Sequence, residues 1–304
     1  MKKTYHLCLS AGNEIMFRDL EDYNRGFNCF ALALYKSCST GLVESFMSNH
    51  CHMIVQSERP ADLIYNFRLS YTMYFNRKYF RTGRLGEKRH FTMDVVGYHH
   101  TLAALSYVLR NSLHHGISPI PYSYPHSTVN SIFLQEMGKQ PCENILSPKH
   151  YRRFVNKSSE IPDNYIMSES GVFLRDSVLD IPQVEALYVT PRAFNWYMTR
   201  KSSEEWESEQ RKDKIDRSPI NLSTIEKGVS IDTLEKMLIH ENGKSDYRKL
   251  SDIDVCTIID RILVPEFAMS SVYQLTPDQK IQIANFLHHN HKLNESQIRR
   301  CLAM

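Results

Sequence analysis

The chain has 304 residues, of which 42% are hydrophobic and 11% aromatic, enough apolar side chain to exclude a wholly disordered protein. The formal net charge is only +3, but residues 1–128 hold 14 Lys+Arg against 9 Asp+Glu, so the front of the chain is the favoured contact for a polyanion. No apolar run approaches the ~20 residues of a membrane span, and seven scattered cysteines without a CxxC pair predict a reduced, cytoplasmic protein.

Hydrophobic periodicity and turn residues predict seven elements in the first part of the chain. They are a strand over 4–9, a helix over 19–36, strands near 42–46 and over 50–56, a helix over 61–81, a strand over 90–96, and a helix over 98–115 capped by Gly116. The first six follow the split βαβ, ferredoxin-like order, which predicts an α+β fold with an antiparallel sheet and helices on one face.

The remainder predicts a mainly helical extension over 129–304, separate from a first domain over 1–128. Capping signals at Thr276 and Asn294 open two short helices over 276–304, which resemble a helix-turn-helix. In that interpretation Arg299 and Arg300 contact DNA. The second helix is short for a recognition helix, so a helical pair packed on the body, or an oligomerisation tail, is an equal alternative.

The segment Ser48-Asn49-His50-Cys51-His52-Met53 contains the strongest chemical signal. Side chains alternate along a strand, so His50 and His52 share a face and Cys51 points the other way. Two imidazoles ~6.6 Å apart along a strand can converge on one metal ion. Alone, however, an HxH pair among 14 histidines is more typical of ordinary surface or core residues.

A second pair lies on the helix predicted over 98–115. Tyr107 and Asn111 stand at i and i+4, hence on one helix face. A tyrosine can be a nucleophile and an asparagine can give oxygen to a metal. Tyrosines also commonly pack helices against sheets, so this pair is not diagnostic by itself.

The region between these pairs is basic and aromatic. It contains only one acid, Glu87, and aromatic residues are interleaved with its basic residues. Such a helix suits a phosphate backbone and unstacked bases, although most of the aromatic residues fit a core. Its basic residues are Arg68, Arg77, Lys78, Arg81, Arg84, Lys88 and Arg89.

Together these segments resemble the single-tyrosine HUH transposases, and within them the REP-associated tyrosine transposases. Residues 47–55 (MSNHCHMIV) are similar to the family pattern MPNHFHLLL, and 71–85 are similar to YxxYFNRRxxRxGHL. Residues 107–117 are similar to YIHLNPVRAGL, and 124–128 to WPYSS. Ser112 and Tyr124 depart from the family residues, Pro and Trp, at those positions.

The resemblance implies a DNA strand-transfer enzyme. His50 and His52 would bind Mg²⁺ or Mn²⁺ with Asn111 as third ligand, and Tyr107 would attack a phosphodiester to form a 5′-phosphotyrosine. Imidazole ligands suit Mn²⁺ better than Mg²⁺. The implied partners are single-stranded DNA hairpins, with the protein a monomer or a homodimer.

Two other interpretations remain open. A non-catalytic DNA-binding regulator could keep the fold and lose turnover. An unrelated HxH metallohydrolase would need further His or Asp ligands on other strands, and would leave Tyr107 and the basic helix over 68–89 unexplained.

Overall fold

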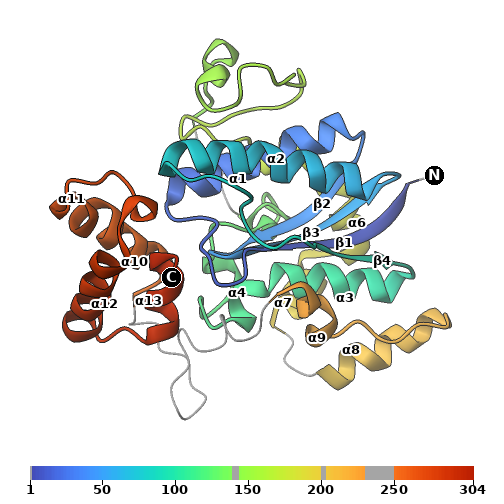
Figure 1. The fold of residues 1–304 in the computed structure, drawn as a ribbon. Coiled ribbons are helices and arrows are strands. Elements are labelled where there is room, and N and C mark those ends of the chain that lie inside the picture. Colours follow the sequence, from blue (N-terminus) through green and yellow to red (C-terminus); the bar gives the residue numbers. More distant parts are fainter. Residues whose placement is uncertain (1, 139–143, 200–202, 230–249) are drawn as a thin grey trace.

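The computed structural model describes residues 2–138, 144–199, 203–229 and 250–304. At its centre is a four-stranded antiparallel sheet in the order β2-β3-β1-β4 (Figure 1). The strands are β1 (Lys3–Ser10), β2 (Thr40–Phe46), β3 (His50–Ser57) and β4 (Phe91–Val95). This order of elements and strands confirms the predicted α+β, ferredoxin-like architecture.

Helices α1 (Leu20–Lys36) and α2 (Pro60–Tyr79) lie side by side on one face of this sheet (Figure 1). The α1 helix begins where the Asp19 side chain accepts a hydrogen bond from the Asp22 backbone N–H. The α2 helix has Pro60 in its first turn, where a missing N–H costs nothing. Both helices lie within two residues of the predicted ranges 19–36 and 61–81.

The other face of the sheet is covered by α3 (Tyr98–Leu109) and the short α4 (Asn111–His114) (Figure 1). One continuous helix was predicted over 98–115, but it is interrupted at Arg110. Gly116 adopts a φ of +64°, the left-handed conformation expected after a helix end. Helices occupy both faces because nearly every side chain of β3 is buried, so each face needs cover.

Residues after 128 wrap around this unit. The main core includes Phe173, Phe194 and Ile225 beside the sheet residues, so it continues past the predicted boundary at residue 128. None of the helices in the described ranges is both long and apolar enough to cross a bilayer. The α-helices described after residue 128 are α5 (Arg175–Val178), α6 (Ile181–Tyr188), α7 (Pro191–Thr199), α8 (Ser203–Gln210), α9 (Leu222–Ile225), α10 (Asp252–Ile258), α11 (Val264–Glu266), α12 (Pro277–His291) and α13 (Glu295–Leu302).

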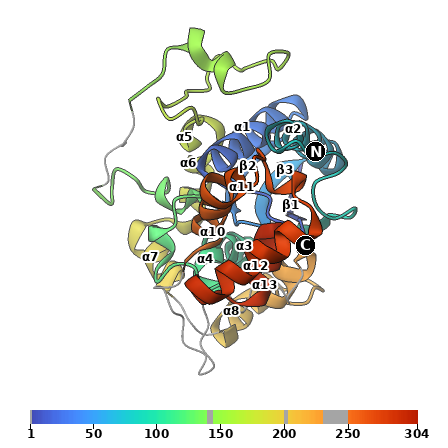
Figure 2. The same cartoon turned by 60° about the vertical axis from the view of Figure 1, so that its left-hand side comes forward.

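The last helices, α10–α13, form a second core that takes in Ile15 from the first unit (Figure 2). The predicted caps of the helices at 276–304 are present, with Thr276 and Gln279 in a capping box and Asn294 at an N-cap. Their role as a DNA-binding helix-turn-helix stays a prediction.

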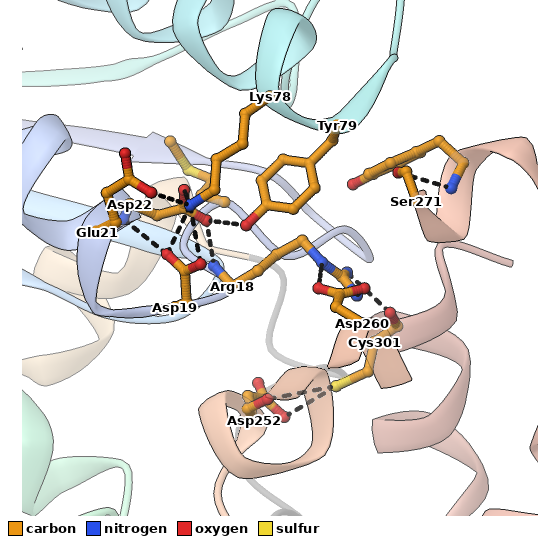
Figure 3. A network of polar contacts seen from close by, with 12 residues as sticks. Arg18, Asp19, Glu21, Asp22, Lys78, Tyr79, Asp252, Asp260, Ser271 and Cys301 are labelled. Atoms are coloured by element: carbon orange, nitrogen blue, oxygen red, sulfur yellow. Dashed lines mark hydrogen bonds and ion pairs between the residues drawn. The ribbon is translucent and has the colours of Figure 1, made fainter. Parts of the chain in front are cut away.

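A buried arginine attaches these helices to the sheet unit (Figure 3). Arg18 is fully buried and donates to both carboxylate oxygens of Asp260, at 2.7 and 2.8 Å, and to the Cys301 carbonyl at 2.9 Å. Its guanidinium also lies over the rings of Tyr79 and Tyr273. The bidentate geometry makes this the most directional contact between the two parts.

We expect Arg18→Ala to lower the free energy of unfolding by about 3 kcal/mol, because the substitution leaves Asp260 without its buried partner. Arg299→Ala is the control, since Arg299 pairs with Glu295 at an exposed site and its loss should cost under ~1 kcal/mol. Urea unfolding measures both. Equal losses for the two variants would contradict this assignment.

Candidate metal and nucleophile site

His50 and His52 lie on the α3 face of β3, as the strand alternation predicted. In the sheet register His50 stands opposite Ser10, and His52 stands between Cys8 of β1 and Ser45 of β2. Both imidazoles are fully buried. Cys51 points into the opposite, apolar side of the sheet, where burial raises the pKa of its thiol.

Each imidazole is held through Nδ1 by a neighbour. His50 Nδ1 lies 3.0 Å from Asn49 Oδ1, and His52 Nδ1 lies 3.0 Å from His6 Nε2. Such contacts fix ring orientation and leave the two Nε2 atoms as the donor atoms for a ligand. Burial, together with His52 and His115, lowers the pKa of His50 well below its usual range, so its imidazole is neutral, as a metal ligand must be.

The Nε2 atoms face groups from two distant segments. Asn111 Nδ2 lies 3.1 Å from His50 Nε2, so the structure brings the predicted third ligand beside the histidine pair. On the other side Glu226 Oε1 lies 3.4 Å from His52 Nε2 and 3.3 Å from His115 Nε2. Ligand atoms of His50, His52 and Glu226 all lie within 4.8 Å of one another.

The hydrogen-bonding of this cluster fits a cation. Among the described residues, Asn111 Oδ1 makes no hydrogen bond, and His52 Nε2, His115 Nε2 and the Glu226 carboxylate make none beyond their ion-pair contacts of 3.3 to 3.4 Å. Buried polar groups are normally satisfied, and a divalent cation bound here would satisfy these atoms. Two imidazoles, a carboxylate and an amide oxygen form a donor set suited to Mn²⁺ and related divalent ions.

Glu226 is the functional candidate that sequence reasoning missed. It lies in a short 3₁₀ turn, Glu226–Gly228, placed against β1 and β4 by close packing of Gly228 on Cys8 and Phe91. Burial opposes its ionisation, but His52 and His115 lower its pKa well below the usual range. No spacing rule links Glu226 to residues 50–52, because only the folded chain brings these segments together.

Tyr107 lies one helical turn before Asn111 and is buried, with 4% of its surface exposed. Its ring packs 5.6 Å from the His114 ring and 5.5 Å from the Trp206 ring of α8. Burial raises the pKa of Tyr107, and the Arg110 guanidinium opposes that shift. Its role as nucleophile stays a prediction.

Some of the predicted DNA-contacting residues are occupied by contacts within the protein, and others are exposed. Lys78 is paired with Asp19, Glu21 and Asp22, and Arg81 forms a bidentate pair with Glu14. Arg68 is half-buried and donates to the Lys88 carbonyl. The exposed residues are Arg77, Arg84, Lys88, Arg89 and Arg299.

Arg300 does not fit a DNA contact. Only 1% of it is exposed, and its guanidinium donates to the carboxylate of Asp252 at 3.0 and 3.1 Å. Asp252 in turn accepts from Ser48, next to the histidine strand. Arg300 therefore holds α13 and α10 against the sheet unit, and the prediction that it binds DNA is wrong for this packing.

Comparisons with known proteins give little more. No family model matches the chain, and no curated protein matches it. One similar solved structure is a REP-associated tyrosine transposase bound to a REP hairpin, with 12% identity and a TM-score of 0.36, covering 53% of this chain and 93% of that chain. A likeness of this size carries no information on activity.

We expect Mn²⁺ to bind the protein and raise its melting temperature, because a ligand of the folded state stabilises it. The double variant His50→Ala/His52→Ala should abolish Mn²⁺ binding. Glu226→Gln should weaken it at least about tenfold, since mutating a residue that only hydrogen-bonds a metal ligand already lowers metal affinity about 10–100-fold. His289→Ala, at an exposed site on α12, is the control. Calorimetric titration measures affinity, and unchanged binding by the double variant would refute the site.

Proposed function

We propose that the protein is a metal-dependent endonuclease and transposase for single-stranded DNA, which cleaves and rejoins strands through a 5′-phosphotyrosine on Tyr107. The observation that supports this most is the convergence of His50, His52 and Asn111, with Tyr107 in the last turn of α3 and Asn111 four residues later at the start of α4. These residues come from two of the four HUH-like motifs, 47–55 and 107–117. Hairpins of REP type are the proposed substrate.

The proposed reaction consists of bond formation, bond cleavage and proton transfer. The Tyr107 hydroxyl oxygen forms a bond to phosphorus, the bond from phosphorus to the 3′-oxygen breaks, and the proton lost by tyrosine must reach an acceptor while the 3′-oxygen gains one. A bound divalent ion supplies charge neutralisation at a non-bridging phosphate oxygen. Arg110 favours the tyrosinate, against the burial that disfavours it. Covalent capture keeps the bond energy, so rejoining needs no ATP.

The exposed basic residues form the proposed DNA surface. Arg77 lies in the last turn of α2, and Arg84, Lys88 and Arg89 follow in the loop before β4. Residues already neutralised by carboxylates, Lys78 and Arg81, contribute less to phosphate binding because their charge is compensated.

A second candidate function is supported by the burial of the site. Residues 203–229, here called the covering segment, place Trp206 on Tyr107 and Glu226 on His52. Only 4% of Tyr107 is exposed in this arrangement, which restricts the approach of a strand and favours a non-catalytic DNA-binding regulator derived from a transposase. The enzymatic proposal therefore requires the covering segment to move away during DNA binding.

Tyr107→Phe should form no covalent adduct with a labelled hairpin strand in Mg²⁺ or Mn²⁺, whereas wild type should form a denaturant-resistant adduct, because only the hydroxyl is removed. Tyr98→Phe is the matched control, since its hydroxyl donates to the Leu187 carbonyl at an exposed site. Gel electrophoresis under denaturing conditions is the measurement.

Equal adduct from Tyr107→Phe and wild type would exclude Tyr107 as nucleophile. Hairpin binding without an adduct under any metal condition would favour the regulator. Metal-dependent hydrolysis without an adduct would favour the metallohydrolase, for which Glu226 supplies the ligand that the sequence lacked.

Asp213→Asn should speed adduct formation about tenfold, by weakening charge-assisted hydrogen bonds worth about 1.5–3 kcal/mol each and raising the open population. Asp213 anchors the covering segment on α3, accepting from the backbone N–H and Nδ1 of both His99 and His100 at 2.7–3.1 Å. Arg217→Ala, which removes an exposed pair with Asp94, should act more weakly. Hydrogen exchange shows whether the covering segment is loosened in Asp213→Asn. If the segment is loosened but adduct formation is slower than in wild type, the prediction is contradicted.

A further inference from the structure

A cavity lies on the α1 side of the sheet, away from His50 and His52. Its volume is about 210 Å³, which is below the ~300–1,000 Å³ typical of sites for larger ligands. The walls come from the first turns of α1, the end of β2, the 125–126 loop and the 170–175 loop, and Figure 2 shows α5 beside α1. The apolar side chains of the lining are Leu20, Tyr23, Phe27, Phe46, Pro125 and Val172.

Arg175 gives this cavity a planar donor. Its guanidinium lies over the Phe27 ring, 4.8 Å from the ring centre, and its Nε donates to Glu44 at 2.6 Å. The two terminal nitrogens of Arg175 bond none of the described residues. The guanidinium is therefore fixed in position by Nε and Phe27, with its remaining donors available.

His126 adds a second polar group. Only 9% of it is exposed, and its ring is stacked on Tyr23 at a centroid distance of 3.7 Å and an angle of 14°. Neither ring nitrogen hydrogen-bonds a side chain or backbone group of the described residues, although the residue lines the cavity. Burial, with a smaller contribution from Arg175, lowers the pKa of His126 to about 3, so the ring is neutral and offers one donor and one acceptor.

The charges limit the class of ligand. Glu44 is fully buried and already balances the charge of Arg175. A carboxylate or phosphate on Arg175 would add a second anion beside Glu44, at an energetic cost. A neutral planar ligand with two adjacent acceptors satisfies the guanidinium without that repulsion. Among the nucleobases, guanine presents such a pair in O6 and N7.

We propose that this cavity binds one unstacked guanine base, with O6 and N7 facing the terminal nitrogens of Arg175 and the ring among Tyr23, Phe27 and Phe46. This rests on the proposed function, in which the partner is single-stranded DNA with accessible bases. The pocket is a base-reading site separate from the metal centre, and it gives the protein a preference for a guanine within its target strand.

The test uses full-length metal-free Tyr107→Phe protein, so that cleavage does not contribute. Calorimetric titration compares short single strands that contain one guanine, one 7-deazaguanine or one adenine at the same position, and also compares free deoxyguanosine. The guanine strand should bind at least about fivefold more tightly than either analogue, since a bidentate base contact is worth ~1–3 kcal/mol. Deoxyguanosine competition distinguishes a free nucleoside ligand from a base held in a strand.

Two variants test the location. Arg175→Lys keeps the charge opposite Glu44 but loses the planar fork, and should remove the preference for guanine over 7-deazaguanine. Leu20→Trp, at a side chain 60% exposed on the cavity wall, should block the cavity without disturbing the core. Ile281→Trp, 48% exposed on α12, is its matched control.

The guanine-pocket proposal is refuted if Tyr107→Phe protein without further substitutions binds the three strands equally. It is also refuted if adding Leu20→Trp leaves the preference for guanine unchanged. Neither result bears on Tyr107 and the metal centre, which the adduct assay tests separately. Conversely, a guanine preference that Leu20→Trp abolishes supports the pocket even in a protein that forms no adduct.

Discussion

The arrangement of this protein depends on a group of polar atoms buried between β3, α4 and the 226–228 turn. Ligand atoms of His50, His52 and Glu226 lie within 4.8 Å of one another, and the side-chain amide of Asn111 lies beside His50. Removing such groups from water is costly unless something compensates, and a divalent cation does so for all of them together. The Asn49 and His6 contacts hold the imidazoles in position for that ligand.

The C-terminal extension has two roles around this centre. The covering segment completes the ligand set with Glu226 and encloses Tyr107 under Trp206. The helices α10–α13 attach to the sheet unit through two sets of contacts. Arg18 of the sheet unit pairs with Asp260, and Asp252 bonds both Ser48 and Arg300. The extension is therefore part of the same site, and in the proposed function both metal binding and access to Tyr107 depend on how firmly it is held.

Charge in the basic region shows why a sequence count is a poor guide to a binding surface. Arg77 and Lys78 are adjacent, yet one is exposed and the other lies among three carboxylates (Figure 3). Arg299 and Arg300 differ in the same way. Consecutive residues on a helix are separated by about 100°, so one can face solvent while its neighbour enters the core, and only the partners present in three dimensions decide which charges remain available.

What the sequence by itself determined is local. Alternation on a strand put His50 and His52 on one face, and capping residues placed the helix starts at Thr276 and Asn294. These features follow from interactions within a few residues. The tertiary structure alone decided the contribution of Glu226, the burial of Tyr107, the loss of Arg300 to Asp252, and the cavity between Arg175 and His126, because each depends on segments brought together by burial of a shared core, which no short-range pattern encodes.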